Sequence, residues 1–157
     1  MKMWIGIVVL ALAVPAAALA QLATVDHTTP SQVLEKEKEL KQMAATKDGS
    51  ASVKISEYPN HFTMLAYRAK TGGGEIHQKN ADFFYVVQGS ATLLSGGKLV
   101  NPTSQGPDEM RGTAVEDGIE TPLHAGDFVH IPAGVPHQLV LPAGQDLCYF
   151  VIKVKEQ

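Results

Sequence analysis

The sequence predicts an all-β domain preceded by a single helix, and two observations support this prediction. From Ser52 onward, short apolar segments are separated by Gly, Pro and Asn, which is typical of strands joined by turns. Before Ser52, the segment Thr29-Pro30-Ser31-Gln32 has the form of a helix start. The 157 residues, of which 45% are hydrophobic and 18% charged, have the size and balance of one globular domain.

The helix is expected to run from Thr29, its N-cap, to about Thr46. Pro30 occupies the first helical position, where a missing N–H costs nothing, and Gln32 can complete a capping box with Thr29. Asp48-Gly49-Ser50 then ends the helix. The apolar stripe expected to pack on the outside of the domain or on a neighbouring subunit consists of Val33, Leu34, Leu40, Met43 and Ala44.

Strands are expected over the rest of the chain, and no internal repeat suggests a propeller or solenoid. Between the strands that end near Val100 and begin at Asp127, a long polar segment rich in Gly and Pro is expected to be a loop. It is either a lid over a site, with residues 101–120 covering the mouth, or a surface excursion without a role. The expected strands are 53–57, 63–68, 75–79, 83–88, 91–94, 98–100, 127–131, 138–141 and 147–154.

The N-terminus has the pattern of a secretory signal peptide. Lys2 precedes an apolar run from Trp4 to Leu19, and Ala18-Leu19-Ala20 suits cleavage before Gln21. An uncleaved membrane anchor is the alternative, but the run is short for a bilayer span and contains Pro15. We therefore expect residues 1–20 to be removed and the product to be exported, either periplasmic or extracellular. Residues 21–51 then form an extension with the helix, and residues 52–157 the β domain.

Charge and cysteine content exclude several functions. The net charge is −3, the pI is near 6.0, and no run of Lys or Arg forms a basic patch, so nucleic acid is not an expected partner. Cys148 has no partner for a disulfide and is interpreted as a buried thiol on a strand. No nucleophile–base pair or phosphate-binding loop is present, which disfavours triad hydrolysis and nucleotide chemistry.

Two imidazoles and two carboxylates are the candidate functional groups. In a strand, residues two apart share a face, so Glu75, His77 and Lys79 are expected to point to one side. Asp82 opens the next strand, and His137 opens another after a tight turn. Such nitrogen and oxygen ligands, gathered from separate strands, suit manganese, iron, nickel or zinc.

The segment GDFVHIPAGVPH contains Gly126, Pro132, Gly134 and His137 at the spacing of the second cupin motif. The Asn that usually follows four residues later is replaced by Leu141. The chain therefore resembles a single-domain cupin, and the resemblance extends over about residues 52–154. It implies a cupin double-stranded β-helix, which is a jelly-roll barrel, with an N-terminal helix.

The first cupin motif is altered. With Gly89 as the anchor, the carboxylate position falls on Asp82, the second His position on His77 and the first His position on Glu75. The resemblance implies that Glu75, His77, Asp82 and His137 are the metal ligands. Two of these positions hold substitutions, because Glu75 replaces a His and Asp82 replaces a longer Glu.

Lys79, Tyr85 and His130 are candidates for contact with a small-molecule ligand. Lys79 either pairs with Asp82 and replaces the metal, or binds a carboxylate of the substrate. Tyr85 is a core aromatic or a hydrogen-bond donor to substrate, and His130 is a core or rim histidine or lines the barrel.

Three functions are compatible with these residues. The first is an exported metal-dependent enzyme of oxygenase, isomerase or lyase type. The second is a non-catalytic module that binds a sugar or organic acid without metal. The third is a structural dimer subunit whose barrel is packed solid. The resemblance also implies a homodimer, for which the helix and the terminal apolar strand are candidate interfaces.

Overall fold

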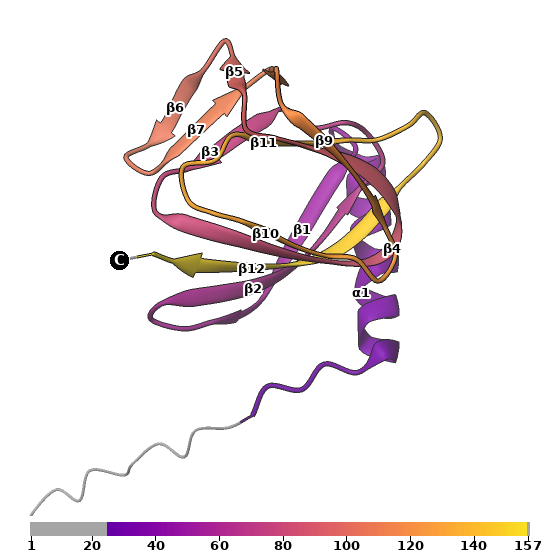
Figure 1. Cartoon of the computed structure of the whole chain (residues 1–157). Helices are drawn as coiled ribbons and strands as arrows, with labels where there is room; N and C mark the ends of the chain where they lie inside the picture. The colour runs from indigo at the N-terminus through magenta and orange to yellow at the C-terminus, as the bar shows by residue number, and fades with distance from the viewer. Residues whose placement is uncertain (1–24, 157) are drawn as a thin grey trace, which may run out of the picture.

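The computed structural model describes residues 25–156, which form one helix and twelve strands (Figure 1). The predicted signal peptide lies outside the described residues. The one helix described is neither long nor apolar enough to cross a membrane. The elements are α1 Pro30–Ala45, β1 Ser50–Glu57, β2 His61–Arg68, β3 Gly74–His77, β4 Asn80–Ser95, β5 Lys98–Val100, β6 Thr103–Gly106, β7 Glu109–Gly112, β8 Ala114–Glu116, β9 Ile119–His124, β10 Phe128–Ile131, β11 His137–Val140 and β12 Leu147–Lys155.

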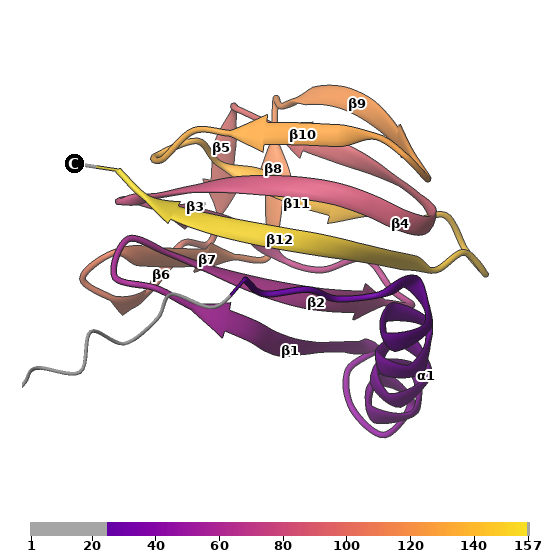
Figure 2. The same ribbon diagram turned by 90° about the horizontal axis from the view of Figure 1, so that it is seen from below.

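The predicted helix is confirmed, including its capping box. The Gln32 backbone N–H donates to Thr29 Oγ1 at 3.3 Å, and the Thr29 backbone N–H donates to Gln32 Oε1 at 2.8 Å. The helix packs beside β1 and β2 on the outside of the barrel (Figures 1 and 2). Leu34 and Met43, which were predicted to belong to the apolar stripe, are instead exposed. The packed cluster between helix and sheet contains Val33, Leu40, Ala44, Leu65, Tyr67 and Cys148.

Cys148 is buried beneath the helix, as its apolar surroundings in the sequence predicted. Burial raises the pKa of its thiol to about 12. Since the thiolate is the nucleophilic form, Cys148 is an inert packing residue at neutral pH.

Ten of the strands form two facing antiparallel sheets that share β4, and β5 pairs with β8 in a separate two-stranded sheet. The first half of β4 pairs with β12 and β10, and its second half pairs with β11 and β9. The remaining order runs outward through β2 and β1 on one side and through β3, β7 and β6 on the other. The layers are seen edge-on in Figure 2. Between them lies the main core of Ala66, Phe84, Val86, Ala91, Leu93, Leu123, Ile131, Leu139, Leu141, Leu147, Tyr149 and Val151.

Strand β4 is continuous where two separate strands were predicted. Its change of sheet occurs at Gly89, which has a φ of +85°. A Cβ at this position would collide with the carbonyl oxygen of Asp146. The sequence places a glycine between two apolar runs, and such a glycine is as compatible with a bend inside a strand as with a turn between strands.

The polar segment after Val100 was predicted to be a loop, and this prediction is wrong. It forms β6, β7, β8 and β9, and β7 pairs with β3 along the side of the barrel. β6 is mostly exposed and β7 is half-buried along its whole length, so neither has the alternation of apolar residues that identifies a strand in a sequence. The segment is therefore part of the barrel wall and not a detached lid.

Replacing Gly89 by Ala should destabilise the protein by about 2 kcal/mol or more, because both the left-handed backbone and the contact with Asp146 resist a Cβ. Gly144→Ala is the matched control, since Gly144 has a φ of +76° with nothing near its missing Cβ. Urea unfolding of both variants measures the difference. Equal losses of unfolding free energy would show that the close approach at Gly89 is unimportant.

Candidate metal centre

Cross-strand pairing brings the candidate ligands together at one end of the barrel interior. His137 on β11 lies opposite Glu75 on β3, and His77 lies two residues after Glu75 on the same strand. Glu75, His77 and His137 each offer a ligand atom within 4.8 Å of the others. Three of the four predicted ligands therefore form a cluster with the spacing of a metal site.

The histidine Nε2 atoms converge on carboxylate oxygens without forming hydrogen bonds. His77 Nε2 lies 3.6 Å from Glu75 Oε2 and 3.5 Å from Asp82 Oδ2. His137 Nε2 lies 3.5 Å from Glu75 Oε1 and 3.6 Å from Asp82 Oδ2. Both Nε2 atoms are buried, and neither has a hydrogen-bond partner among the described residues. Buried polar atoms are normally satisfied, so this arrangement fits a cation between Glu75, His77 and His137.

The tautomer of His137 also suits metal binding. Its Nδ1–H donates to the backbone carbonyl of Val135 at 2.9 Å. A carbonyl oxygen only accepts, so in the neutral ring Nε2 carries the free lone pair and faces Glu75. Such a hydrogen bond behind a ligand histidine fixes its orientation.

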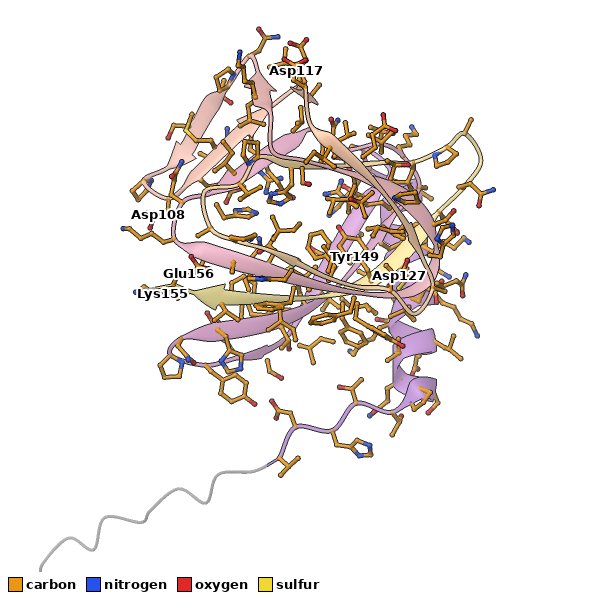
Figure 3. The ribbon with its side chains drawn as sticks, in the orientation of Figure 1. Asp108, Asp117, Asp127, Tyr149, Lys155 and Glu156 are labelled. Carbon is orange, nitrogen blue, oxygen red and sulfur yellow. The ribbon has the colours of Figure 1, made fainter. Side chains whose placement is uncertain are left out.

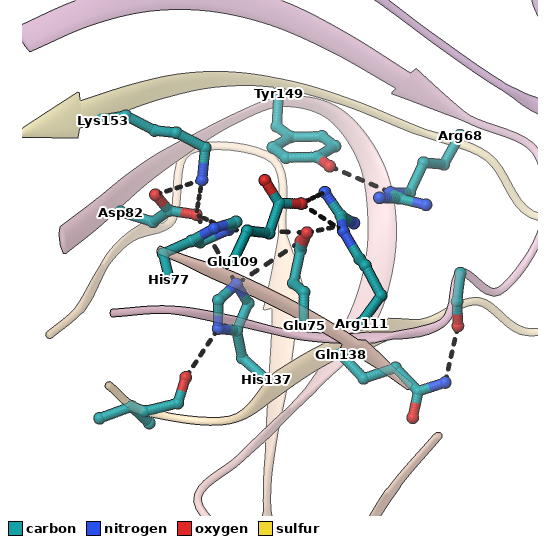
Figure 4. A network of polar contacts seen from close by, with 12 residues as sticks. Arg68, Glu75, His77, Asp82, Glu109, Arg111, His137, Gln138, Tyr149 and Lys153 are labelled. Atoms are coloured by element: carbon teal, nitrogen blue, oxygen red, sulfur yellow. Dashed lines mark hydrogen bonds and ion pairs between the residues drawn. The ribbon is translucent and has the colours of Figure 1, made fainter. Parts of the chain in front are cut away.

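Two cations neutralise the two carboxylates (Figure 4). Lys153 Nζ on β12 lies 2.6 Å from both carboxylate oxygens of Asp82, which is its cross-strand partner. Arg111 on β7 forms an ion pair with Glu75, its own cross-strand partner, and lies 2.5 Å from Glu109 Oε1. Asp82 is thus near both histidines, as predicted, but Lys153 contacts both of its oxygens.

These surroundings keep both carboxylates ionised. Burial alone would raise the pKa of Glu75, but the contact with His137 and the charge of Arg111 outweigh it and hold the pKa far below its usual range. Burial also opposes ionisation of Asp82, and His137 and Lys153 together lower its pKa. Anionic oxygen ligands are therefore available at neutral pH.

The two histidines differ in charge. Burial disfavours the His137 imidazolium, but the carboxylates of Asp82 and Glu75 outweigh burial and raise the pKa of His137 to about 9. For His77, burial and the ammonium group of Lys153 lower the pKa. At pH 7 without a metal, His137 is protonated and His77 is neutral.

The predicted position of Lys79 is wrong. Strand β3 ends at His77, so Lys79 leaves the shared face, and its ammonium group lies 2.9 Å from Asp108 Oδ1 with 60% of the side chain exposed. Lys79 neither pairs with Asp82 nor reaches the cluster of Glu75, His77 and His137. The alternation rule applies only within a strand, and the chain turns directly after His77.

Tyr85 and His130 were predicted to contact a ligand inside the barrel, and the structure places both on its outer surface. Tyr85 on β4 is 47% exposed, and its neighbours Phe84 and Val86 are the ones that point inward. His130 is exposed on β10 and stacks on Phe83 with 4.4 Å between ring centroids. The apolar run around Tyr85 is partly buried on both faces of the sheet. The sequence therefore does not show which alternate residues of this run point into the barrel.

Four residues of this region were missed by sequence reasoning. Lys153 and Tyr149 share the inward face of β12 with Val151, so a lysine in phase with buried residues was an available signal. Arg68 ends an apolar strand in the same phase as Ala66. Arg111 had no such signal, because it lies in the polar segment predicted to be a loop.

Comparison with solved structures shows the fold at low sequence identity. The polyketide cyclase RemF from Streptomyces resistomycificus is 16% identical with a TM-score of 0.50, over 68% of this chain and 65% of RemF. KdgF from Halomonas sp. is 15% identical with a TM-score of 0.50, over 71% of this chain and 84% of KdgF. A sugar phosphate isomerase from a cupin superfamily, from Silicibacter pomeroyi, is 18% identical with a TM-score of 0.50, over 71% of this chain and 62% of that chain.

The chain has the cupin fold, a jelly-roll barrel with an N-terminal helix, as the sequence predicted. It spans less than two thirds of the length of the cyclase and of the isomerase. No family model and no curated protein sequence matches it.

Metal binding should release one proton near neutral pH. His137 is protonated below its pKa of about 9 and must lose that proton to bind a cation, whereas His77 is already neutral. The apparent affinity for zinc should therefore rise about tenfold per pH unit between pH 6.5 and 8 and level off above pH 9. Titration calorimetry in two buffers of different ionisation enthalpy counts the protons. Binding at pH 7 without proton release would contradict the assignment of the charge to His137.

Proposed function

We propose that this protein is a metal-dependent cupin enzyme that acts on a small organic molecule inside its barrel. The observation that supports this most directly is the pair of buried Nε2 atoms of His77 and His137, which lack hydrogen-bond partners among residues 25–156 and converge on Glu75. A barrel that needed only to be stable would satisfy or replace these polar atoms.

Glu75, His77 and His137 are the residues that would hold the ion. Two imidazoles and one carboxylate suit manganese, iron, nickel or zinc, and this set leaves coordination positions for substrate. When bound, the metal would supply Lewis-acid or redox chemistry to a coordinated oxygen atom. Asp82 is the fourth predicted ligand, and Lys153 competes with the metal for its oxygens.

A cavity next to the cluster gives the substrate a place to bind. Its volume is about 410 Å³, within the range of small-molecule sites. Glu75 and Asp82 line it together with Lys153 and Arg111, so charged groups of both signs surround a bound molecule. This cavity contradicts the third possibility, a barrel packed solid with side chains.

The chain's own residues would orient the substrate and exclude water. Arg111 and Lys153 hold Glu75 and Asp82 in place, while Phe84 and Val151 give the cavity an apolar wall. The Lys153 ammonium group is the proton donor closest to Asp82 and can stabilise negative charge that develops on the substrate. Fold alone does not define a reaction, although the cyclase and the isomerase show that this barrel accommodates enzymes.

A non-catalytic binding module is the second candidate, and one contact favours it. Lys153 neutralises Asp82 at 2.6 Å, as Lys79 was expected to do in a metal-free barrel. In that case Lys153 replaces the metal, and the cavity binds a sugar or organic acid without transforming it.

Export and dimerisation complete the proposal. Both rest on the sequence: export on the expected cleavage before Gln21, and the homodimer on the resemblance to cupins. The exposed aromatic residues Tyr85 and Phe128 on the outer face of the sheet are compatible with a second copy packing there.

Metal analysis of the purified protein tests the enzyme proposal. We expect about one equivalent of a first-row metal in the wild type, and almost none in His77→Ala and His137→Ala. His130→Ala is the matched control, because this histidine lies outside the barrel and its loss should leave the metal content unchanged. Protein that stays metal-free, and equally stable with or without added manganese, iron, nickel or zinc, would favour the binding module.

Replacing Lys153 by Met separates the two candidates further. Asp82 would become a buried charge without its closest partner, which should cost about 3–5 kcal/mol of unfolding free energy in metal-free protein. Under the enzyme proposal, added metal recovers part of this loss because Asp82 becomes a fourth ligand. Lys79→Met, which removes an exposed ion pair with Asp108, should change stability by about 0.5 kcal/mol or less. Thermal unfolding with and without metal measures both, and no recovery by any metal argues for the module.

A further inference from the structure

The barrel cavity contains an arginine, Arg68, that forms no ion pair with a carboxylate among residues 25–156. Arg68 lies at the end of β2, on the same inward face as Ala66, and lines the cavity. Its guanidinium group has no carboxylate oxygen within 4.0 Å, whereas Arg111 and Lys153 in the same cavity both form ion pairs. A partly buried cation without a counter-ion is costly unless a ligand provides the negative charge.

Asp48 also lines the cavity and attracts the Arg68 guanidinium group, but the two side chains are not in direct contact. Its Oδ1 accepts hydrogen bonds from the backbone N–H and the hydroxyl of Ser50, at 3.2 and 2.9 Å. It forms no ion pair with Arg68 at the 4.0 Å limit that the other pairs satisfy. Arg68 therefore keeps its charge available to the cavity.

The surrounding residues fix the position of the guanidinium group. Its Nε–H donates to the Tyr149 hydroxyl at 3.1 Å, and its Nη1 lies against Gly72, where any Cβ would collide with it. Gly72 is itself held by Gln138, whose Nε2 donates to the Gly72 carbonyl at 2.6 Å. The fork of Arg68 is thus placed before a ligand arrives, which reduces the entropic cost of binding.

Tyr149 adds a second donor at the same place. Its ring lies inside the barrel (Figures 3 and 4). It is buried against Phe84, with 5.1 Å between the ring centroids. Because the hydroxyl oxygen accepts from Arg68, its own proton is free to donate, and the described residues provide no acceptor for it. The same cavity extends to Glu75 and Asp82.

We propose that Arg68 and Tyr149 bind the carboxylate of a small organic acid, whose other end faces the Glu75–His77–His137 centre. The second half of this statement rests on the proposed function, and the first half does not. The remaining N–H groups of a guanidinium match the two oxygens of a carboxylate, and the phenol can donate a third hydrogen bond. The cavity of about 410 Å³ limits the acid to a small molecule.

Binding to metal-free protein tests the proposal independently of the metal. The full chain is treated with EDTA and titrated by calorimetry with two acids and their uncharged counterparts, succinate against succinamide and glucuronate against glucose. At least one acid should bind at least tenfold more tightly than its neutral counterpart. Inorganic phosphate is a further probe, and phosphate binding through Arg68 that exceeds the binding of both acids would overturn the choice of a carboxylate.

Variants locate the binding group. Arg68→Met should weaken binding of the acid about 10- to 100-fold, and Tyr149→Phe should weaken it by a smaller factor of about 3- to 10-fold. Lys98→Met is the matched control, since it removes a positive charge from an exposed position outside the cavity and should leave affinity unchanged. If circular dichroism shows that Arg68→Met does not fold, the comparison uses Tyr149→Phe and Arg68→Lys. Arg68→Lys keeps the positive charge but loses the forked guanidinium group.

The outcomes separate this proposal from the proposed function. Two results would overturn the carboxylate site whatever the metal content. One is that neither acid binds more tightly than its neutral counterpart, and the other is that the Arg68 and Tyr149 variants bind the acid with wild-type affinity. Metal content is measured on the same preparations and should be unchanged in Arg68→Met. Loss of metal with intact acid binding would therefore count against the enzyme alone.

Discussion

The register between neighbouring strands is the constraint on which the charged centre depends. Asp82 lies directly opposite Lys153, Glu75 directly opposite Arg111, and Glu75 also directly opposite His137. Each pair joins charges of opposite sign or a charge with an imidazole, and each is buried or half-buried. A shift of one residue in any of these pairings would turn a side chain to the other face and leave its partner as an uncompensated charge in the barrel. The polar end of the interior therefore adds specificity to a register that the apolar residues already favour.

The barrel interior has an apolar half and a polar half, and single strands run from one half into the other. On β12, Leu147, Tyr149, Val151 and Lys153 follow one another on the inward face, so the strand begins in the core and ends at Asp82. Strand β4 runs antiparallel to β12, so on β4 Asp82 comes first and the buried Phe84 and Val86 follow it toward the core. The core stabilises the barrel through burial of apolar surface. This stability allows the other end of the interior to contain a small cavity with charged walls. Arg68 and Tyr149 lie where these two halves meet.

Much of the fold was readable because its signals are local. The helix from Pro30 follows from its capping box, and the strands with an apolar face follow from their alternation. His77, Glu75 and His137 were found because two of them share a strand and the third follows a turn of recognisable spacing. The polar segment after Val100 was misread, since its strands are held by backbone pairing with β3 rather than by an apolar face. Tyr85 and His130 were placed wrongly, because an apolar run does not reveal which parity faces the interior.

The sequence by itself determined the all-β class, the position of the helix and three residues of the centre, while its resemblance to cupins implied the type of barrel. These follow from interactions between residues close along the chain, namely caps, turns and alternation within a strand. Only the tertiary structure decided that Lys153 rather than Lys79 neutralises Asp82, that Arg111 pairs with Glu75, and that Arg68 and Tyr149 share a cavity with them. These are contacts between strands far apart in the sequence. Their partners depend on strand order and register, which no local pattern contains.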